Sequence, residues 1–145
     1  MIGLIQRVSR ASVHVHEQKT GSIGRGILLL LGIEKEDNHE HVVKMARKVA
    51  KIRIFEDENG KMNNSLQDIK GELLVVSQFT LAADTQKGNR PGFSNAAANS
   101  LSESLYNDFI QHYQNEYGVC QQGKFGANMQ VALCNDGPAT FYIKL

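Results

Sequence analysis

The residues best suited to chemistry in this chain follow directly on a short apolar run. Residues 73–76 are Leu-Leu-Val-Val and predict a buried strand, because a continuous apolar run has no polar face to present to water. Ser77, Gln78 and Thr80 then place two hydroxyls and an amide at the end of that strand, with Phe79 between them. Polar side chains at a strand exit are well placed to bind a ligand. The same residue types also satisfy backbone groups in ordinary turns.

Thr80 is the candidate nucleophile of this segment, because its hydroxyl attacks a carbonyl once a base removes its proton. None of the five histidines is close to Thr80 in the sequence. The backbone N–H groups of Phe79 and Thr80 offer a second mechanism, in which they stabilise the negative charge that develops on a carbonyl oxygen. We favour the second mechanism and keep the first open. The catalytic candidates are Ser77, Gln78, Phe79 and Thr80.

Composition indicates one globular domain over residues 1–145. The chain is 41% hydrophobic and 21% charged, which is typical of a folded protein and not of a disordered one. A formal net charge of +1 argues against a protein that coats nucleic acid through its whole surface. A local contact with an RNA end remains open. Arg7 interrupts the apolar N-terminal residues, and no apolar run approaches about 18 residues, so we expect a cytoplasmic protein.

No metal site or cofactor is predicted. Cys120 and Cys134 are too few and too widely separated for a zinc site or a disulfide framework. His14 and His16 share one face of a predicted strand, and such a pair can chelate a metal. A solvated strand face explains the two histidines equally simply, and we favour that interpretation.

Alternating and continuous apolar patterns predict a series of short strands. Two strands are expected over residues 2–8 and 11–15, with Ser9 and Arg10 as their connection. Residues 27–33 form the most apolar run and predict a central buried strand. Further strands are expected around Ile23 and over residues 129–133 and 140–145, with residues 135–138 as an interruption between the last two.

Two amphipathic helices are expected. The first has Asp37 or Asn38 as its N-cap and continues to about Arg53, and the second begins at Ser94 as N-cap and ends at Gly118. Two helices among several short strands favour an α+β fold, in which a mostly antiparallel, barrel-like sheet is covered on one side by two packed helices.

One face of the first predicted helix is basic. Its cations recur at helical spacing opposite the apolar stripe, and they are Lys44, Arg47, Lys48 and Lys51. Such a row is usually a solvated face, and it is also the best candidate in the chain for a surface that contacts phosphates.

Three motifs, in this order, resemble the D-aminoacyl-tRNA deacylase family, also called D-tyrosyl-tRNA deacylases. They are SQFTLAAD at residues 77–84, KGNRPGF at 87–93 and NDGPAT at 135–140. The resemblance begins at IQRVSRASV, residues 5–13, and extends to the C-terminus. One departure is Ala139, where the family usually has a larger apolar residue.

The resemblance implies an enzyme that hydrolyses the ester between a D-amino acid, or glycine, and the 3′-terminal adenosine of tRNA. It also implies a homodimer, in which a cis Gly137-Pro138 turn of one subunit enters the site of the other. Arg7 is expected to steady this turn, and Met129 to contribute to substrate binding. The pocket wall is expected from Ser77, Gln78, Phe79 and Thr80.

Two other classes of function stay open on the residues alone. A hydrolase with Thr80 as nucleophile would act on small esters or amides without preferring one enantiomer. A non-catalytic module would bind an RNA end and cleave nothing.

Overall fold

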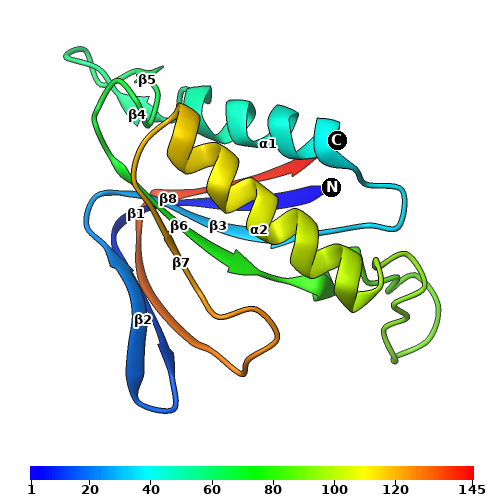
Figure 1. The fold of residues 1–145 in the computed structure, drawn as a ribbon. Coiled ribbons are helices and arrows are strands. Elements are labelled where there is room, and N and C mark those ends of the chain that lie inside the picture. Colours follow the sequence, from blue (N-terminus) through cyan, green and yellow to red (C-terminus); the bar gives the residue numbers. More distant parts are fainter.

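The computed structural model describes residues 1–145 and shows one strongly curved sheet with two helices across one of its faces (Figure 1). The six strands of this sheet run in the order β2-β1-β3-β6-β7, and β8 pairs with β1. A separate two-stranded hairpin is formed by β4 and β5. The strands are β1 Ile2–Val15, β2 Gln18–Ile23, β3 Gly26–Gly32, β4 Phe55–Glu56, β5 Met62–Asn64, β6 Glu72–Ser77, β7 Cys120–Gln122 and β8 Gln130–Lys144, and the helices are α1 His39–Lys51, the short 3-10 helix η1 Phe79–Ala82, and α2 Asn99–Glu116.

Strand β1 is the longest element shared by both halves of the sheet. It pairs antiparallel with β3 through its first half, with β2 through its second half and with β8 along both. The predicted break at Ser9 and Arg10 is therefore wrong, because both residues stay within one continuous strand. The predicted interruption at residues 135–138 is likewise absorbed into β8, where the pairing register shifts on either side of Val8. A bulge of this kind adds residues to one strand without ending it.

Strand β6 is parallel to both of its neighbours. Leu29 of β3 lies opposite Val75, and Leu73 lies opposite Cys120 of β7. All four apolar residues of the run 73–76 are buried, as a strand in a parallel, covered position requires. The other pairings in the sheet are antiparallel, so the predicted α+β fold with a mostly antiparallel, barrel-like sheet is confirmed.

The sheet curls until its two edges approach each other. Gly21 of β2 lies so near β7 that a Cβ atom placed on it would be 2.9 Å from the backbone oxygen of Gln122. The hairpin of β1 and β2 extends away from the helices at the bottom of Figure 1. The curl gives the sheet a helix-covered outer face and a narrow interior.

Each face of the sheet buries its own apolar set. The larger core lies between the sheet and the two helices and includes Leu29, Val75 and Phe109. The smaller core fills the interior of the curl and includes Leu28 and Val76. Because side chains alternate along a strand, β3 and β6 contribute to both cores.

The two helices begin at residues with different surroundings. Asn38 caps α1 as predicted, because its side chain accepts hydrogen bonds from the backbone of Glu40 and His41. Ser94 does not cap α2, which begins at Asn99. The preceding residues form a bridge to the end of β3 instead, in which the backbone N–H of Ala97 donates to the oxygen of Ile33 at 3.0 Å. Neither helix is long and apolar enough to span a membrane.

Candidate active site

A pocket of about 530 Å³ lies where β6 ends. Its walls come from the ends of β3 and β6, the first turns of α2, the segment before α2 and the segment that leads into β8. Ten of its sixteen lining residues are hydrophobic. The lining residues are Leu31, Ile33, Val76, Ser77, Gln78, Phe79, Ala96, Ala97, Asn99, Ser102, Phe125, Gly126, Ala127, Asn128, Met129 and Val131.

The structure brings four of the predicted site residues together in this pocket. Ser77, Gln78 and Phe79 line it from the end of β6, and Met129 lines it from the opposite segment. Thr80 is not among the lining residues and is exposed. Its hydroxyl accepts a hydrogen bond from the side-chain amide of Gln78.

The backbone turns sharply after β6 and leaves two donors free. The N–H of Gln78 still donates to Leu31 at 2.8 Å and completes the pairing with β3. The next two N–H groups, of Phe79 and Thr80, donate to no group of the chain, because η1 begins there and its first bonds start at Leu81. Two adjacent free amides at a pocket wall form a site that can accept a negatively charged oxygen.

The pocket has no side chain that titrates. Its polar groups are neutral amides and hydroxyls, namely those of Ser77, Gln78, Asn99, Ser102 and Asn128. No histidine, carboxylate, lysine or cysteine lines it. The pocket can therefore orient a neutral ester and stabilise an oxyanion, whereas proton transfer must come from water or from the substrate itself.

Two exposed aromatic rings lie beside this wall. Phe79 is 58% exposed and Phe93 is 41% exposed, and their ring centroids are 5.1 Å apart. The intervening loop is closed by paired backbone hydrogen bonds between Asp84 and Gly92. This pairing explains why the motifs at residues 77–84 and 87–93 belong to one structural unit.

The Gly137-Pro138 peptide bond is cis, and the turn projects from β8 opposite Arg7. The Arg7 side chain is buried, and its Nε donates to the backbone oxygen of Asp136 at 2.9 Å. Its Nη1 donates to the oxygen of Ile54 at 2.7 Å, which ties the turn to the segment after α1. Gly137 and Pro138 are both exposed, and neither lines the pocket of its own chain.

Gly137 occupies a conformation that suits glycine. Its φ of 132° lies in the region that side chains disfavour, and an added Cβ would be 2.9 Å from Nη2 of Arg7. Ala139, which follows the turn, is buried, and its N–H donates to the side chain of Asn135 at 2.8 Å. A small residue at position 139 therefore lies under the turn, while the turn residues themselves face solvent.

Part of the pocket had no signal in the sequence. Ala96, Ala97 and residues 125–128 contribute a large share of its wall, yet they show neither periodicity nor a motif of known chemistry. The basic residues of α1 lie elsewhere: Lys44, Arg47, Lys48 and Lys51 are exposed and none lines the pocket.

The comparisons with known proteins agree with this geometry. The family model for D-Tyr-tRNA(Tyr) deacylase matches residues 4–144. A D-aminoacyl-tRNA deacylase of Pseudoalteromonas atlantica is 55% identical, and one of Haemophilus influenzae is 56% identical, each over 100% of both chains.

Two solved structures show the same fold. One, described as c-Myc DNA unwinding element binding protein, has a TM-score of 0.95 and 43% identity, and the match covers 100% of this chain and 99% of that one. A probable eukaryotic D-amino acid tRNA deacylase shares the fold with a TM-score of 0.84 at 17% identity, over 98% of each chain. From the family match and the full-length relatives, the chain belongs to the D-Tyr-tRNA(Tyr) deacylase family.

Proposed function

We propose that this protein is a hydrolase that cleaves the ester between a D-amino acid and the 3′-terminal adenosine of tRNA in the cytoplasm, releasing both. The observation that carries the proposal is a neutral pocket with two free backbone amides at its wall. The names of the two bacterial relatives support the choice of substrate.

The proposed mechanism depends on the backbone more than on side chains. The ester carbonyl oxygen lies against the N–H groups of Phe79 and Thr80, which stabilise its negative charge in the transition state. The attacking oxygen comes from water, assisted by the 2′-hydroxyl of the terminal ribose. An aminoacyl ester is an activated bond, so this arrangement needs no strong side-chain base. The absence of any titratable side chain among the lining residues favours this route over attack by Thr80.

Rejection of L-aminoacyl-tRNA is the demanding part of the function. A discrimination of about 10⁴ corresponds to about 5.5 kcal/mol, because each factor of ten is about 1.4 kcal/mol. Hydrogen bonds to groups that both enantiomers share contribute nothing to this difference. A rigid wall at the position of the L side chain contributes all of it through steric clash. Glycine has no side chain to clash, so the same filter accepts glycyl-tRNA.

We assign this wall to Gly137 and Pro138 of a partner subunit in a homodimer. Both residues are exposed and absent from the pocket of their own chain. The turn is held from below by Arg7, as a rigid wall requires. Strand β8 pairs only with β1, so its other edge is open, and it exposes Leu133 and Tyr142. An open edge with exposed apolar side chains is suited to association with a second copy.

The proposed activity is tested by one comparison of three substrates: D-Tyr-tRNA, L-Tyr-tRNA and Gly-tRNA. We expect hydrolysis of the first and third and preservation of the second, which amounts to proofreading of chirality in translation. Equal cleavage of D- and L-Tyr-tRNA would indicate an unselective esterase. Cleavage of none of the three would indicate a module that only binds RNA ends.

A further inference from the structure

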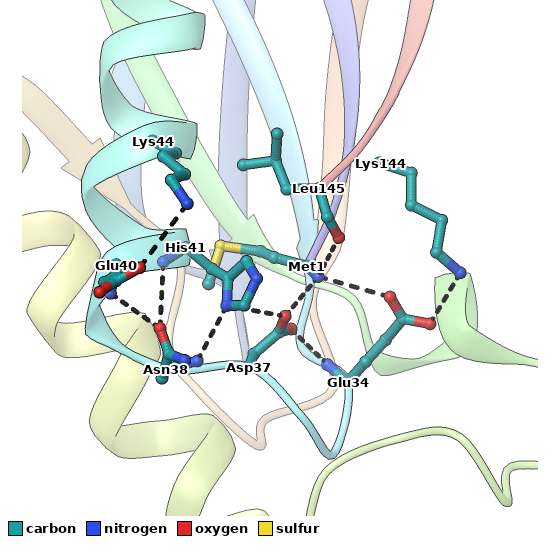
Figure 2. A network of polar contacts seen from close by, with 9 residues as sticks. All are labelled: Met1, Glu34, Asp37, Asn38, Glu40, His41, Lys44, Lys144 and Leu145. Carbon is teal, nitrogen blue, oxygen red and sulfur yellow. Dashed lines mark hydrogen bonds and ion pairs between the residues drawn. The ribbon is translucent and has the colours of Figure 1, made fainter.

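The backbone amine of Met1 is buried in a network of charges (Figure 2). It donates to Oδ1 of Asp37 at 2.5 Å, and Oε2 of Glu34 lies 3.4 Å away. The backbone oxygen of Leu145 accepts a further hydrogen bond at 3.3 Å. The amine is fully buried and the Asp37 side chain is 4% exposed, so water replaces neither partner.

The two carboxylates are in turn fixed by other groups. The second oxygen of Asp37 accepts the backbone N–H of Glu34 at 2.7 Å, which closes the turn around the amine. The second oxygen of Glu34 accepts a hydrogen bond from Lys144 at 3.0 Å. Burial opposes ionisation of Glu34, but Lys144 and the Met1 amine outweigh it and hold the pKa of Glu34 below its usual value. The network therefore stabilises the turn at residues 34–37 in one arrangement.

This turn is bonded directly to the wall of the pocket. The backbone oxygen of Ile33 accepts from Ala97 at 3.0 Å, and the N–H of Lys35 donates to Asn95 at 3.2 Å. Glu34 lies opposite Ala96 in the same bridge. Ile33, Ala96 and Ala97 all line the pocket. A displacement of the turn would consequently move the wall that faces Met129 and Phe125.

We propose that the unblocked α-ammonium of Met1 is a positioning group for the pocket, so that acylation of this amine, by a formyl or acetyl group, switches the site to a less active form. Acylation removes the positive charge and one or more N–H donors and adds bulk at a buried atom. It leaves the carboxylate of Asp37 buried without its main partner, which is a strongly unfavourable state. The turn at residues 34–37 then opens, and the segment from Asn95 to Ala97 moves with it.

The test compares three forms of the full chain. One has a free Met1 amine, one is acetylated at that amine, and one has Gly-Ser joined before Met1, which converts the amine to an uncharged amide. Each is assayed with D-Tyr-tRNA at a temperature at which all three are folded, and hydrogen exchange is followed at the N–H groups of Lys35 and Ala97. We expect about 10²-fold lower kcat/KM in both blocked forms, the size associated with a displacement of about 1 Å. Exchange at both amides should be faster in the blocked forms.

Two variants separate positioning from general stability. In Asp37→Asn the partner is neutral, so acetylation should cause little additional loss, because both changes break the same contact. In Glu36→Gln, an exposed neighbour without a role in the network, acetylation should cause the same loss as in the natural chain. An unchanged kcat/KM in the folded blocked forms, with only a lower Tm, would overturn the proposal. The assay rests on the proposed deacylation, whereas the exchange measurement does not: a free form inactive on every substrate refutes the function, and the exchange rates still decide the role of the amine.

Discussion

The hydroxyl of Thr80 lies outside the pocket and already accepts a hydrogen bond from Gln78. No carboxylate or histidine is within hydrogen-bonding range of it, so nothing in the chain activates it as a nucleophile. The neighbouring amides of Phe79 and Thr80, which any side chain at position 80 leaves in place, provide the proposed stabilisation of the oxyanion instead.

Thr80→Ala should therefore retain deacylation of D-Tyr-tRNA to within about tenfold, since a missing general base or nucleophile costs about 10²–10⁴. The measurement is the single-turnover rate, with Thr20→Ala on β2 as a control for the same change away from the site. A loss greater than about 10³ would show that the hydroxyl takes part in the chemistry.

Gly137 is the second residue at which one atom decides the outcome. Gly137→Ala places a Cβ atom 2.9 Å from Nη2 of Arg7 at a φ of 132°, so the turn must shift. We expect kcat/KM for D-Tyr-tRNA to fall at least about tenfold, with a stability loss of only about 1 kcal/mol. Gly60→Ala is the matched control, because Gly60 also has a positive φ, of 72°, but lies in the turn between β4 and β5. Full activity in a folded Gly137→Ala protein would contradict the role of the turn.

At the scale of elements, α2 is fastened to the sheet by one buried hydroxyl. Tyr106 donates to the backbone oxygen of Val75 at 2.9 Å, and its hydroxyl is also 3.4 Å from the oxygen of Gly123. Burial raises the pKa of Tyr106 well above its usual value of 10.0, so the hydroxyl stays protonated and remains a donor. The bond joins α2, β6 and the exit of β7 next to the pocket.

Tyr106→Phe should lower the free energy of unfolding by about 1 kcal/mol, the net contribution of a typical hydrogen bond. The loss is limited because the oxygen of Val75 keeps a second donor, the N–H of Gly123 at 2.9 Å. Urea unfolding measures it, with Tyr113→Phe as the control, since the Tyr113 hydroxyl bonds to no other group of the chain. Equal losses in both variants would show that the effect is packing and not this hydrogen bond.

Elements with local signals were predicted well, and elements that depend on distant partners were not. Asn38 caps α1 through its own neighbours, so the sequence was sufficient. The start of α2 was placed too early because the bonds of residues 95 and 97 to β3 compete with helix formation. The three residues of β7 are too few for a periodic signal, and they form a strand only because β6 is beside them.

The candidate site shows the same division. The segment from Ser77 to Phe79 and the residue Met129 were predicted and do line one pocket. Thr80 was predicted as part of the wall, but the turn into η1 leaves it exposed outside the pocket. Ala96 and Ala97 were missed because small apolar residues reveal their position only through the bridge to the end of β3.

At the scale of the whole molecule, the two ends of the chain meet in one charged network. Leu145 donates to the backbone oxygen of Met1 at 3.0 Å, and Lys144 pairs with Glu34 beside them. The partners of Glu34 lower its pKa below 4.5, its usual value in an unfolded chain. The folded state therefore binds fewer protons than the unfolded state around this pH, and stability falls as the solution becomes more acidic.

We expect the Tm to be nearly constant above about pH 5 and to decrease as the pH falls through and below about 4.5. The two exposed carboxyls whose pKa values are also lowered, those of Asp57 and Asp68, act in the same direction. In Glu34→Gln the Tm should be lower at neutral pH and should change less between pH 5 and pH 3. A Tm profile identical in shape to that of the natural chain would show that Glu34 does not contribute to acid sensitivity.

The central claim is that a neutral pocket hydrolyses the ester while a wall excludes the L side chain. The most direct test is the ratio of kcat/KM for D-Tyr-tRNA to that for L-Tyr-tRNA, measured with the same tRNA. The account predicts a ratio of about 10⁴ or more, equivalent to about 5.5 kcal/mol of discrimination. A ratio near one, with both esters cleaved, would contradict it.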